Sequence, residues 1–208
     1  MKDTKRNIAR AALHLFNQQG FVNVRLQHIA DEANVSVGNL AYHFESKQLI
    51  LMKLYEEIVR KQEALLRHLN VVPLFEHLDH HWQEAHQLQQ QYSFFYIDTL
   101  ELLRSNEQLA QKHRTHIYWE VQQYASMLNF NISRGVIASN STHEEIVVLA
   151  NQLWMTENSW LHQAAIRDQD DVSSQRFREQ LWALLLPNMT PMGLQEYKQL
   201  IKLRKITL

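Results

Sequence analysis

Residues that end helices and form tight turns are scarce in this chain. Its 208 residues include only four glycines and three prolines, whereas sheet-rich proteins need many turns built from these residue types. A hydrophobic fraction of 45% is sufficient for a substantial core. We therefore expect an all-α protein in which short connections join its helices.

Several classes of protein are excluded by what the sequence lacks. The absence of cysteine excludes disulfide bonds, thiolate metal sites and thiol redox sensing. No apolar run resembles a signal peptide or approaches the roughly 18 residues of a membrane span. There is no glycine-rich phosphate loop and no nucleophile elbow. We expect a cytoplasmic protein that is not an enzyme, has no cofactor and has no membrane partner.

The first 47 residues contain three short segments with helical spacing. The first, residues 3–19, has its apolar residues on one side and ends at Gly20. The second covers residues 26–33 and is followed by Asn34, which tolerates the left-handed conformation of a tight turn. Ser36 is a good N-cap for the third segment. A helix, a tight turn and a helix, braced by a first helix, form a helix-turn-helix that places its second helix in the DNA major groove.

The third segment, residues 37–44, has an apolar side and a polar side. Val37, Leu40 and Phe44 are expected to be buried, which leaves the polar side free to contact DNA. Lysines and arginines nearby can reach phosphates. Residues 1–47 carry six basic and four acidic side chains, or +2, so the rest of the chain sums to −3. The expected DNA-binding residues are Lys5, Arg6, Arg25, Gln27, His28, Ser36, Gly38, Asn39, Tyr42, His43 and Lys47.

Each of these residues also has a structural interpretation. Tyr42 can be a core aromatic, and Asn39 can be an ordinary residue of a helix surface. Lys5 and Arg6 form either an arm that contacts the DNA backbone or a solvated terminus.

The segment IADEANVSVGNLAYHFESK, residues 29–47, resembles the signature of the TetR family of bacterial repressors. The resemblance covers about residues 1–50. Asn34 replaces the usual turn glycine, and Ala41 stands where the family usually has a phosphate-contacting tyrosine. That contact is expected to be absent here, so Tyr42 and His43 are expected to make a larger share of the DNA contacts.

The resemblance implies a DNA-binding domain, residues 1–47, and a helical ligand-binding and dimerisation domain, residues 48–208. It implies a double-stranded DNA operator, an unknown small-molecule effector and a homodimer formed through helices near 142–168 and 173–186. A dimer is also expected physically, because one head reads too few base pairs whereas a two-fold dimer reads both halves of a palindrome.

Helical periodicity continues through the rest of the chain. Residues 92–105 are apolar almost all round, which predicts a buried helix. Thr142 and Glu145 form a capping box at the start of another. The expected helices of the body cover residues 46–70, 73–90, 92–105, 106–133, 142–168, 173–186 and 192–205.

Two carboxylates fall on apolar helix faces of the body, Asp98 and Glu157. Burial of a carboxylate is costly unless the group is paired or hydrogen-bonded. Two explanations stay open: an internal partner such as Arg, Tyr or Trp, or a cavity for a cationic or hydrogen-bonding effector. The aromatic residues nearby line such a cavity or are plain core. The candidate ligand-binding residues are Trp82, Phe95, Tyr96, Asp98, Trp119, Tyr124, Met155 and Glu157.

Histidine pairs at helical spacing, His77 with His81 and His113 with His116, are compatible with a metal site. A chain with 12 histidines produces such pairs by chance, so no metal is expected. The sequence predicts a ligand-responsive repressor that binds a palindromic operator as a homodimer. The alternative is a small-molecule-binding helical protein whose head no longer binds DNA, for which Ala41 is the hint.

Overall fold

The structure is a computed structural model that describes residues 2–138, 142–168 and 172–207. These residues form helices and no β-strand, apart from an isolated antiparallel bridge between Ile137 and Met189. The all-α prediction is confirmed. The helices are α1 (Lys2–Gln19), α2 (Leu26–Glu32), α3 (Val37–His43), α4 (Lys47–Leu69), α5 (Phe75–Gln91), α6 (Ser93–Ile97), α7 (Thr99–Ser105), α8 (Glu107–Ser133), α9 (His143–Ile166), α10 (Ser174–Leu185), the short 3-10 helix η1 (Leu186–Asn188) and α11 (Pro191–Thr207).

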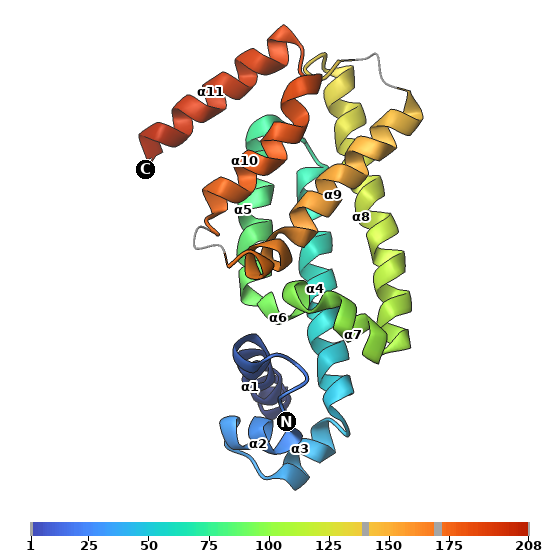
Figure 1. The fold of residues 1–208 in the computed structure, drawn as a ribbon, viewed down its shortest axis with the longest axis vertical. Coiled ribbons are helices and arrows are strands. Elements are labelled where there is room, and N and C mark those ends of the chain that lie inside the picture. The colour runs from blue at the N-terminus through green and yellow to red at the C-terminus, as the bar shows by residue number, and fades with distance from the viewer. Residues whose placement is uncertain (1, 139–141, 169–171, 208) are drawn as a thin grey trace.

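Helices α1 to α3 form a small head at one end of the molecule (Figure 1). Gly20 and Asn34 have positive φ angles of 73° and 53°, so both adopt the left-handed conformation that the tight turns require. The Ser36 hydroxyl accepts a hydrogen bond from the backbone of Asn39 and caps α3. The predicted helix-turn-helix is therefore confirmed in its turn and its cap.

The buried side of α3 is narrower than expected. Leu40 and Phe44 are buried, but Val37 is 38% exposed, so its expected burial is wrong. Val37 is the first residue of α3, one turn before the buried Leu40, and its side chain remains partly open to solvent.

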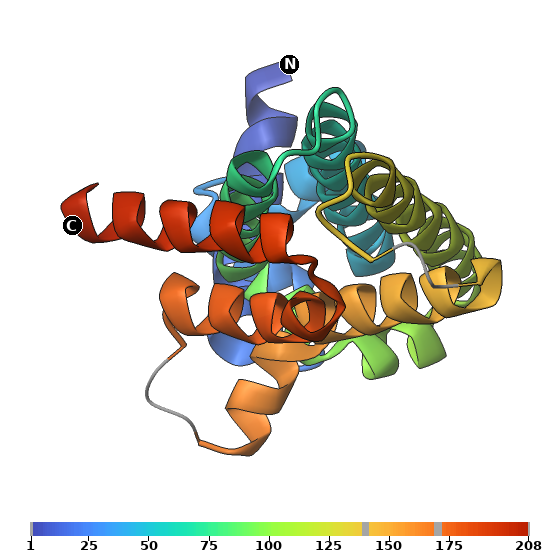
Figure 2. The ribbon, with the colours of Figure 1, turned by 90° about the horizontal axis from the view of Figure 1, so that it is seen from above.

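Helix α4 runs without interruption from the head into the body (Figure 1). Above the head, α8 and α9 pack against each other, while α10 packs on both α5 and α9. Seen from above, α11 lies beside α5 and α10 at one edge (Figure 2). Among the described residues, no helix combines the length and apolar character needed to cross a membrane.

The predicted helix over residues 92–105 is broken at Asp98. This residue has φ and ψ angles of −107° and 20°, which separate α6 from α7. The first part is buried as expected, whereas α7 is buried on one side only: Leu102 is fully buried and Leu100 is 59% exposed. Helix α7 packs on α8 and contributes Leu102 to the core.

The head and the lower body are joined through α1 and α6. The ring centroids of Phe16 on α1 and Phe94 on α6 lie 5.4 Å apart. The Asn17 side chain donates to the carbonyl of Gln91 (2.9 Å) and accepts from the backbone N–H of Phe94 (3.1 Å). One amide side chain thus holds the α5–α6 junction against the head.

Candidate functional site: an exposed head helix and a buried polar network

Helix α3 presents an exposed side at the end of the head. Asn39 is exposed, and Tyr42 is 73% exposed, which rejects the core interpretation of this tyrosine. His43 is half-buried, with its ring 5.2 Å from that of Tyr42. Gly38 and Ala41 are also exposed and leave the backbone accessible. The surface offers amide, phenol and imidazole groups that can contact base edges or phosphates.

The start of α2 lies open to solvent. Arg25, Gln27 and His28 are exposed, as phosphate contact requires. Gln27 donates to Asp31 (2.8 Å), and Nδ1 of His28 accepts from the backbone N–H of Arg25 (3.3 Å). The neutral His28 ring therefore carries its proton on Nε2, and its Nδ1 helps to cap the helix.

The basic side chains of α1 are placed near α3. Lys5 and Arg6 are exposed on the first turns of that helix. The Lys5 ammonium lies 5.1 Å from the centroid of the Phe44 ring, at the end of α3. Lys5 is therefore available next to the helix expected to meet DNA, and Arg6 is exposed one residue further along α1.

Lys47 points into the head, not out of it. Its ammonium donates to the carbonyls of Phe21 (2.7 Å), Val22 (3.3 Å) and Val24 (2.7 Å), and lies 4.3 Å from the Phe21 ring centroid. Burial lowers the pKa of Lys47. We therefore correct its assignment: Lys47 holds the loop between α1 and α2, because its donors are already used by that loop.

The interior of the body contains a chain of polar side chains. Gln62 on α4 donates to the Tyr96 hydroxyl (3.2 Å), and its carbonyl lies 3.0 Å from Nε2 of His116. The same nitrogen lies 3.6 Å from the Glu120 carboxylate, which accepts from the Trp154 indole (2.9 Å). Helices α4, α6, α8 and α9 each contribute to this network.

A second group of polar side chains surrounds Glu157. The Tyr124 hydroxyl donates to its carboxylate and lies 3.1 Å from Nε2 of His81. Gln89 donates to the backbone carbonyl of Glu157 (2.9 Å). Tyr124 is thus an internal partner for Glu157. We call both groups together, Gln62, His81, Gln89, Tyr96, His116, Glu120, Tyr124, Trp154 and Glu157, the polar network.

Burial shifts the titration of the network. It raises the pKa of Glu120 to about 8 and that of Glu157 to about 7. It lowers the pKa of His81 to about 4. The network therefore favours neutral side chains near neutral pH, because charged forms lose hydration inside the protein.

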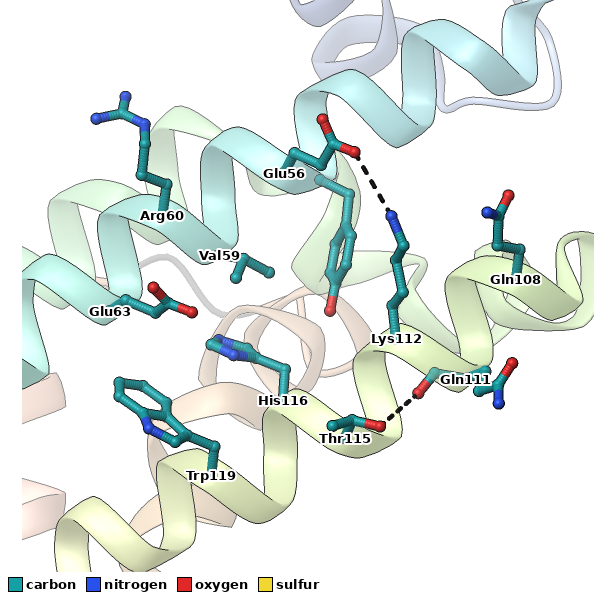
Figure 3. A pocket seen from close by; sticks show the side chains of 11 residues that line it. Glu56, Val59, Arg60, Glu63, Gln108, Gln111, Lys112, Thr115, His116 and Trp119 are labelled. Carbon is teal, nitrogen blue, oxygen red and sulfur yellow. Dashed lines mark hydrogen bonds and ion pairs between the residues drawn. The ribbon is translucent and has the colours of Figure 1, made fainter.

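A groove lies between α4 and α8 (Figure 3). Its volume is about 730 Å³, and Tyr55, His116 and Trp119 supply aromatic walls. The His116 and Trp119 rings stack with centroids 5.6 Å apart. Glu56 and Lys112 form an ion pair of 3.5 Å across the groove. His116 belongs to both the groove and the polar network.

The predicted ligand-binding residues separate into different environments. Phe95, Tyr96 and Tyr124 are buried around the network, and Trp119 lines the groove. Trp82 is fully buried against Trp182, with ring centroids 5.1 Å apart, and is part of the core.

Two predicted cavity residues do not face the body interior. Met155 is 59% exposed on α9, so its cavity assignment is wrong. Asp98 lies at the α6–α7 break, where its carboxylate is 3.6 Å from the position of a Cβ at Gly20. It contacts the turn of the head and is not part of the polar network.

Sequence reasoning missed Glu120, His116 and Gln62. Glu120 follows His116 by four residues and precedes Tyr124 by four, so the three side chains share one face of α8. That face is buried. A run of polar residues on an apolar face was the signal that could have located the network.

The histidine pairs do not form a metal site in the part of the chain that is described. His77 is exposed, with Nδ1 2.6 Å from the carbonyl of Val72, whereas His81 is buried in the network. No group of three His, Cys, Asp or Glu side chains there is arranged to hold an ion.

The chain matches known regulators over most of its length. Residues 59–197 match the TetR family described as "Bacterial transcriptional repressor", and residues 8–53 match "Bacterial regulatory proteins, tetR family". The HTH-type transcriptional regulator RutR of Escherichia coli (strain K12) is 42% identical over 55 residues, or 26% of this chain and 26% of RutR. The match thus spans about a quarter of the length of the curated relatives.

Solved structures share the whole fold. A TetR-family transcriptional regulator from Marinobacter aquaeolei VT8 is 21% identical, with a TM-score of 0.84 and coverage of 95% of this chain and 97% of that chain. A putative transcriptional regulator from Saccharomonospora viridis, in complex with choline, is 18% identical, with a TM-score of 0.74 and coverage of 91% and 98%.

The all-α fold, the helix-turn-helix in the head and the matches to known regulators together define a DNA-binding transcriptional regulator. The chain belongs to the TetR family, whose members are generally not enzymes.

Proposed function

We propose that the protein is a ligand-responsive repressor that binds a palindromic operator as a homodimer. The observation that carries this proposal is the exposed side of α3, capped by Ser36 and carrying Tyr42 at 73% exposure, in a chain of the TetR family. The remaining features concern DNA contact, assembly and ligand response.

In this proposal α3 enters the major groove. Gly38, Asn39, Tyr42 and His43 lie on its exposed side and would contact bases or phosphates. Cations and amides around it would contact the backbone of double-stranded DNA. The supporting residues are Lys5, Arg6, Arg25, Gln27 and His28.

The proposed dimer forms through α9 and α10. Val148, Met155 and Ile166 are 57%, 59% and 66% exposed along α9, and exposed apolar surface of this kind favours an interface. An obligate dimer should bury on the order of 1,500 Å² or more. Two heads would then reach successive major grooves, about 34–36 Å apart.

The proposed ligand site is the body, residues 48–208, and the proposed DNA-binding domain is residues 1–47. The polar network and the α4–α8 groove support ligand binding, because they place polar groups inside an otherwise apolar body. The neighbour in complex with choline supports the view that bodies of this fold accept small molecules. A DNA-binding regulator acts where the chromosome is, so we propose the cytoplasm.

A gel-shift assay tests the head with the DNA upstream of the protein's own gene. Tyr42→Ala should weaken binding and reduce the salt dependence by about one unit of log–log slope if a phosphate contact is lost. The matched control is Tyr118→Ala, because Tyr118 is 70% exposed on α8, far from the head in sequence. It should leave binding unchanged.

Two outcomes would contradict the proposal. Equal affinity in wild type and Tyr42→Ala would remove α3 from the DNA interface. No specific binding by the wild type would favour the alternative, a ligand-binding protein whose head no longer binds DNA. Ala41 is the feature that makes this alternative worth testing, because the usual tyrosine contact is absent.

A further inference from the structure

Two carboxylates lie inside the body without a cationic partner. Glu120 on α8 is 3% exposed, and Glu157 on α9 is 8% exposed. Within the described part of the chain, no lysine or arginine nitrogen lies within 4.0 Å of either group. Among the described residues, the basic groups close to them are His116, 3.6 Å from Glu120, and His81, 3.9 Å from Glu157. A buried carboxylate needs a positive charge or hydrogen bonds to remain ionised, and otherwise takes up a proton.

One more buried atom beside these carboxylates lacks a partner in the described part of the chain. The Gln89 side chain, 1% exposed, donates to the Glu157 backbone, but its own carbonyl oxygen has no hydrogen-bond partner. His81, also buried, contacts the Tyr124 hydroxyl through Nε2 (3.1 Å) and forms a backbone hydrogen bond with Leu65. Native interiors rarely leave a group such as the Gln89 carbonyl unsatisfied, so it needs an explanation. A ligand that donates hydrogen bonds would provide it.

Two spaces lie on either side of the contact between Gln62 and His116. The α4–α8 groove of about 730 Å³ is lined by His116, and a small cavity of about 10 Å³ is lined by His81, Tyr96, Glu120 and Glu157. Gln62 lines the cavity, and its 3.0 Å contact with His116 separates the two spaces. Rotation of these two side chains would join the groove to the cavity that the carboxylates line.

We propose that the effector is a small protonated amine that enters through the α4–α8 groove and places its ammonium group between Glu120 and Glu157. This inference rests on the ligand-responsive function proposed above and adds the chemical class of the ligand. An ammonium with N–H groups fits, because it supplies both the missing positive charge and the missing donors. The aromatic walls formed by Tyr55 and Trp119 suit the alkyl part of such a ligand.

The raised pKa values of the two carboxyls support replacement of a bound proton by the ammonium group of the ligand. Burial raises the pKa of Glu120 to about 8 and that of Glu157 to about 7, so protons neutralise the empty site. An amine that binds would displace about one proton, because the ammonium stabilises the ionised carboxylates. Affinity should therefore increase as the pH rises from about 6 to about 8, while the free amine stays protonated.

The experiment uses the full-length protein and four probes: n-butylamine, spermidine, choline and the neutral n-butanol. Thermal shift and titration calorimetry are measured for wild type, Glu120→Gln, Glu157→Gln and the control Glu144→Gln, an exposed residue on α9. Butylamine or spermidine should raise the melting temperature of wild type and control, whereas n-butanol should not. Either network substitution should weaken amine binding by about tenfold or more, as expected for a lost charge-assisted hydrogen bond.

Calorimetry in buffers of different ionisation enthalpy should show proton release for the amines. The proposal is overturned if neither amine binds, if choline or n-butanol binds as tightly as both amines, or if Glu120→Gln and Glu157→Gln bind amines as wild type does. None of these measurements involves DNA. Failure of the protein to bind operator DNA would therefore reject the proposed repressor function separately. Release of operator DNA by n-butanol but not by the amines would retain that function and reject the proposal that the effector is an amine.

Discussion

Replacing Glu120 with glutamine should stabilise the protein at neutral pH. The carboxyl is 3% exposed, and burial raises its pKa from 4.5 to about 8. Below about pH 4.5 the carboxyl is neutral in both the folded and the unfolded chain, so the raised pKa does not reduce the free energy of unfolding there. As the pH rises from about 4.5 towards 8, the unfolded chain releases the proton while the folded chain retains it, so the free energy of unfolding falls.

The size of the effect follows from the proton count. Between pH 6.5 and 7.5 the folded state binds up to one more proton at Glu120 than the unfolded state. The free energy of unfolding of wild type should fall by up to about 1.4 kcal/mol over that pH unit. At pH 7.5 the accumulated penalty is at most about 4 kcal/mol. An amide cannot ionise, and its oxygen can still accept from the Trp154 indole, which now donates to Glu120 at 2.9 Å.

Urea unfolding followed by circular dichroism at pH 6.5 and 7.5 measures both quantities. Glu120→Gln should be more stable than wild type at pH 7.5 and should show a smaller loss between the two pH values. Glu144→Gln, at an exposed position, should behave as wild type does. Burial raises the pKa of Glu157 to about 7 and the charge of Glu157 raises that of Glu120, so the difference between the curves reports the loss of Glu120 together with its interaction with Glu157. Identical slopes, or a less stable Glu120→Gln, would refute the reasoning and indicate that Glu120 is ionised in the fold.

Other substitutions test the head, its link to the body and the assembly. Lys47→Met should lower the free energy of unfolding by roughly 1–3 kcal/mol, because three loop carbonyls lose their shared donor; unchanged urea midpoints would return Lys47 to the candidates for phosphate contact. Asn17→Ala removes both hydrogen bonds at the α5–α6 junction and should cost about 1–2 kcal/mol, and it should also reduce ligand-induced release of operator DNA in a gel shift. Val148→Glu combined with Met155→Glu places charge on the outer face of α9 and should give monomers in sedimentation; a dimer that survives both changes would place the interface elsewhere.

Local sequence signals predicted the head well. Asn34 and Ser36 specify a left-handed turn and an N-cap within three residues, and both act through their own or the next few backbone groups. Such local chemistry does not depend on the remainder of the fold. Lys47 was different, because its ammonium finds carbonyls more than twenty residues away in sequence. No spacing rule predicts that contact.

The body was predicted in its helices but not in its site. Helix spacing predicted that Glu157 would lie on the buried face of α9, yet it could not supply Tyr124 as the partner from another helix. Met155 shows the reverse error, since an apolar residue on a long helix can face solvent or a second subunit. Asp98 broke a segment whose composition favours a continuous buried helix. Tertiary contacts decided all three outcomes.

Because α4 is continuous, a movement of its body end is transmitted to the head. Its 23 residues extend about 34 Å at the helical rise of about 1.5 Å per residue. Tyr55 and Gln62 lie along its length, next to the groove and the network, while its first residue, Lys47, is bonded to the head. A tilt of only about 5° at the body end would displace the head by about 3 Å over that length. In the homodimer proposed above, a tilt of that size would move the two heads out of step with successive major grooves of DNA.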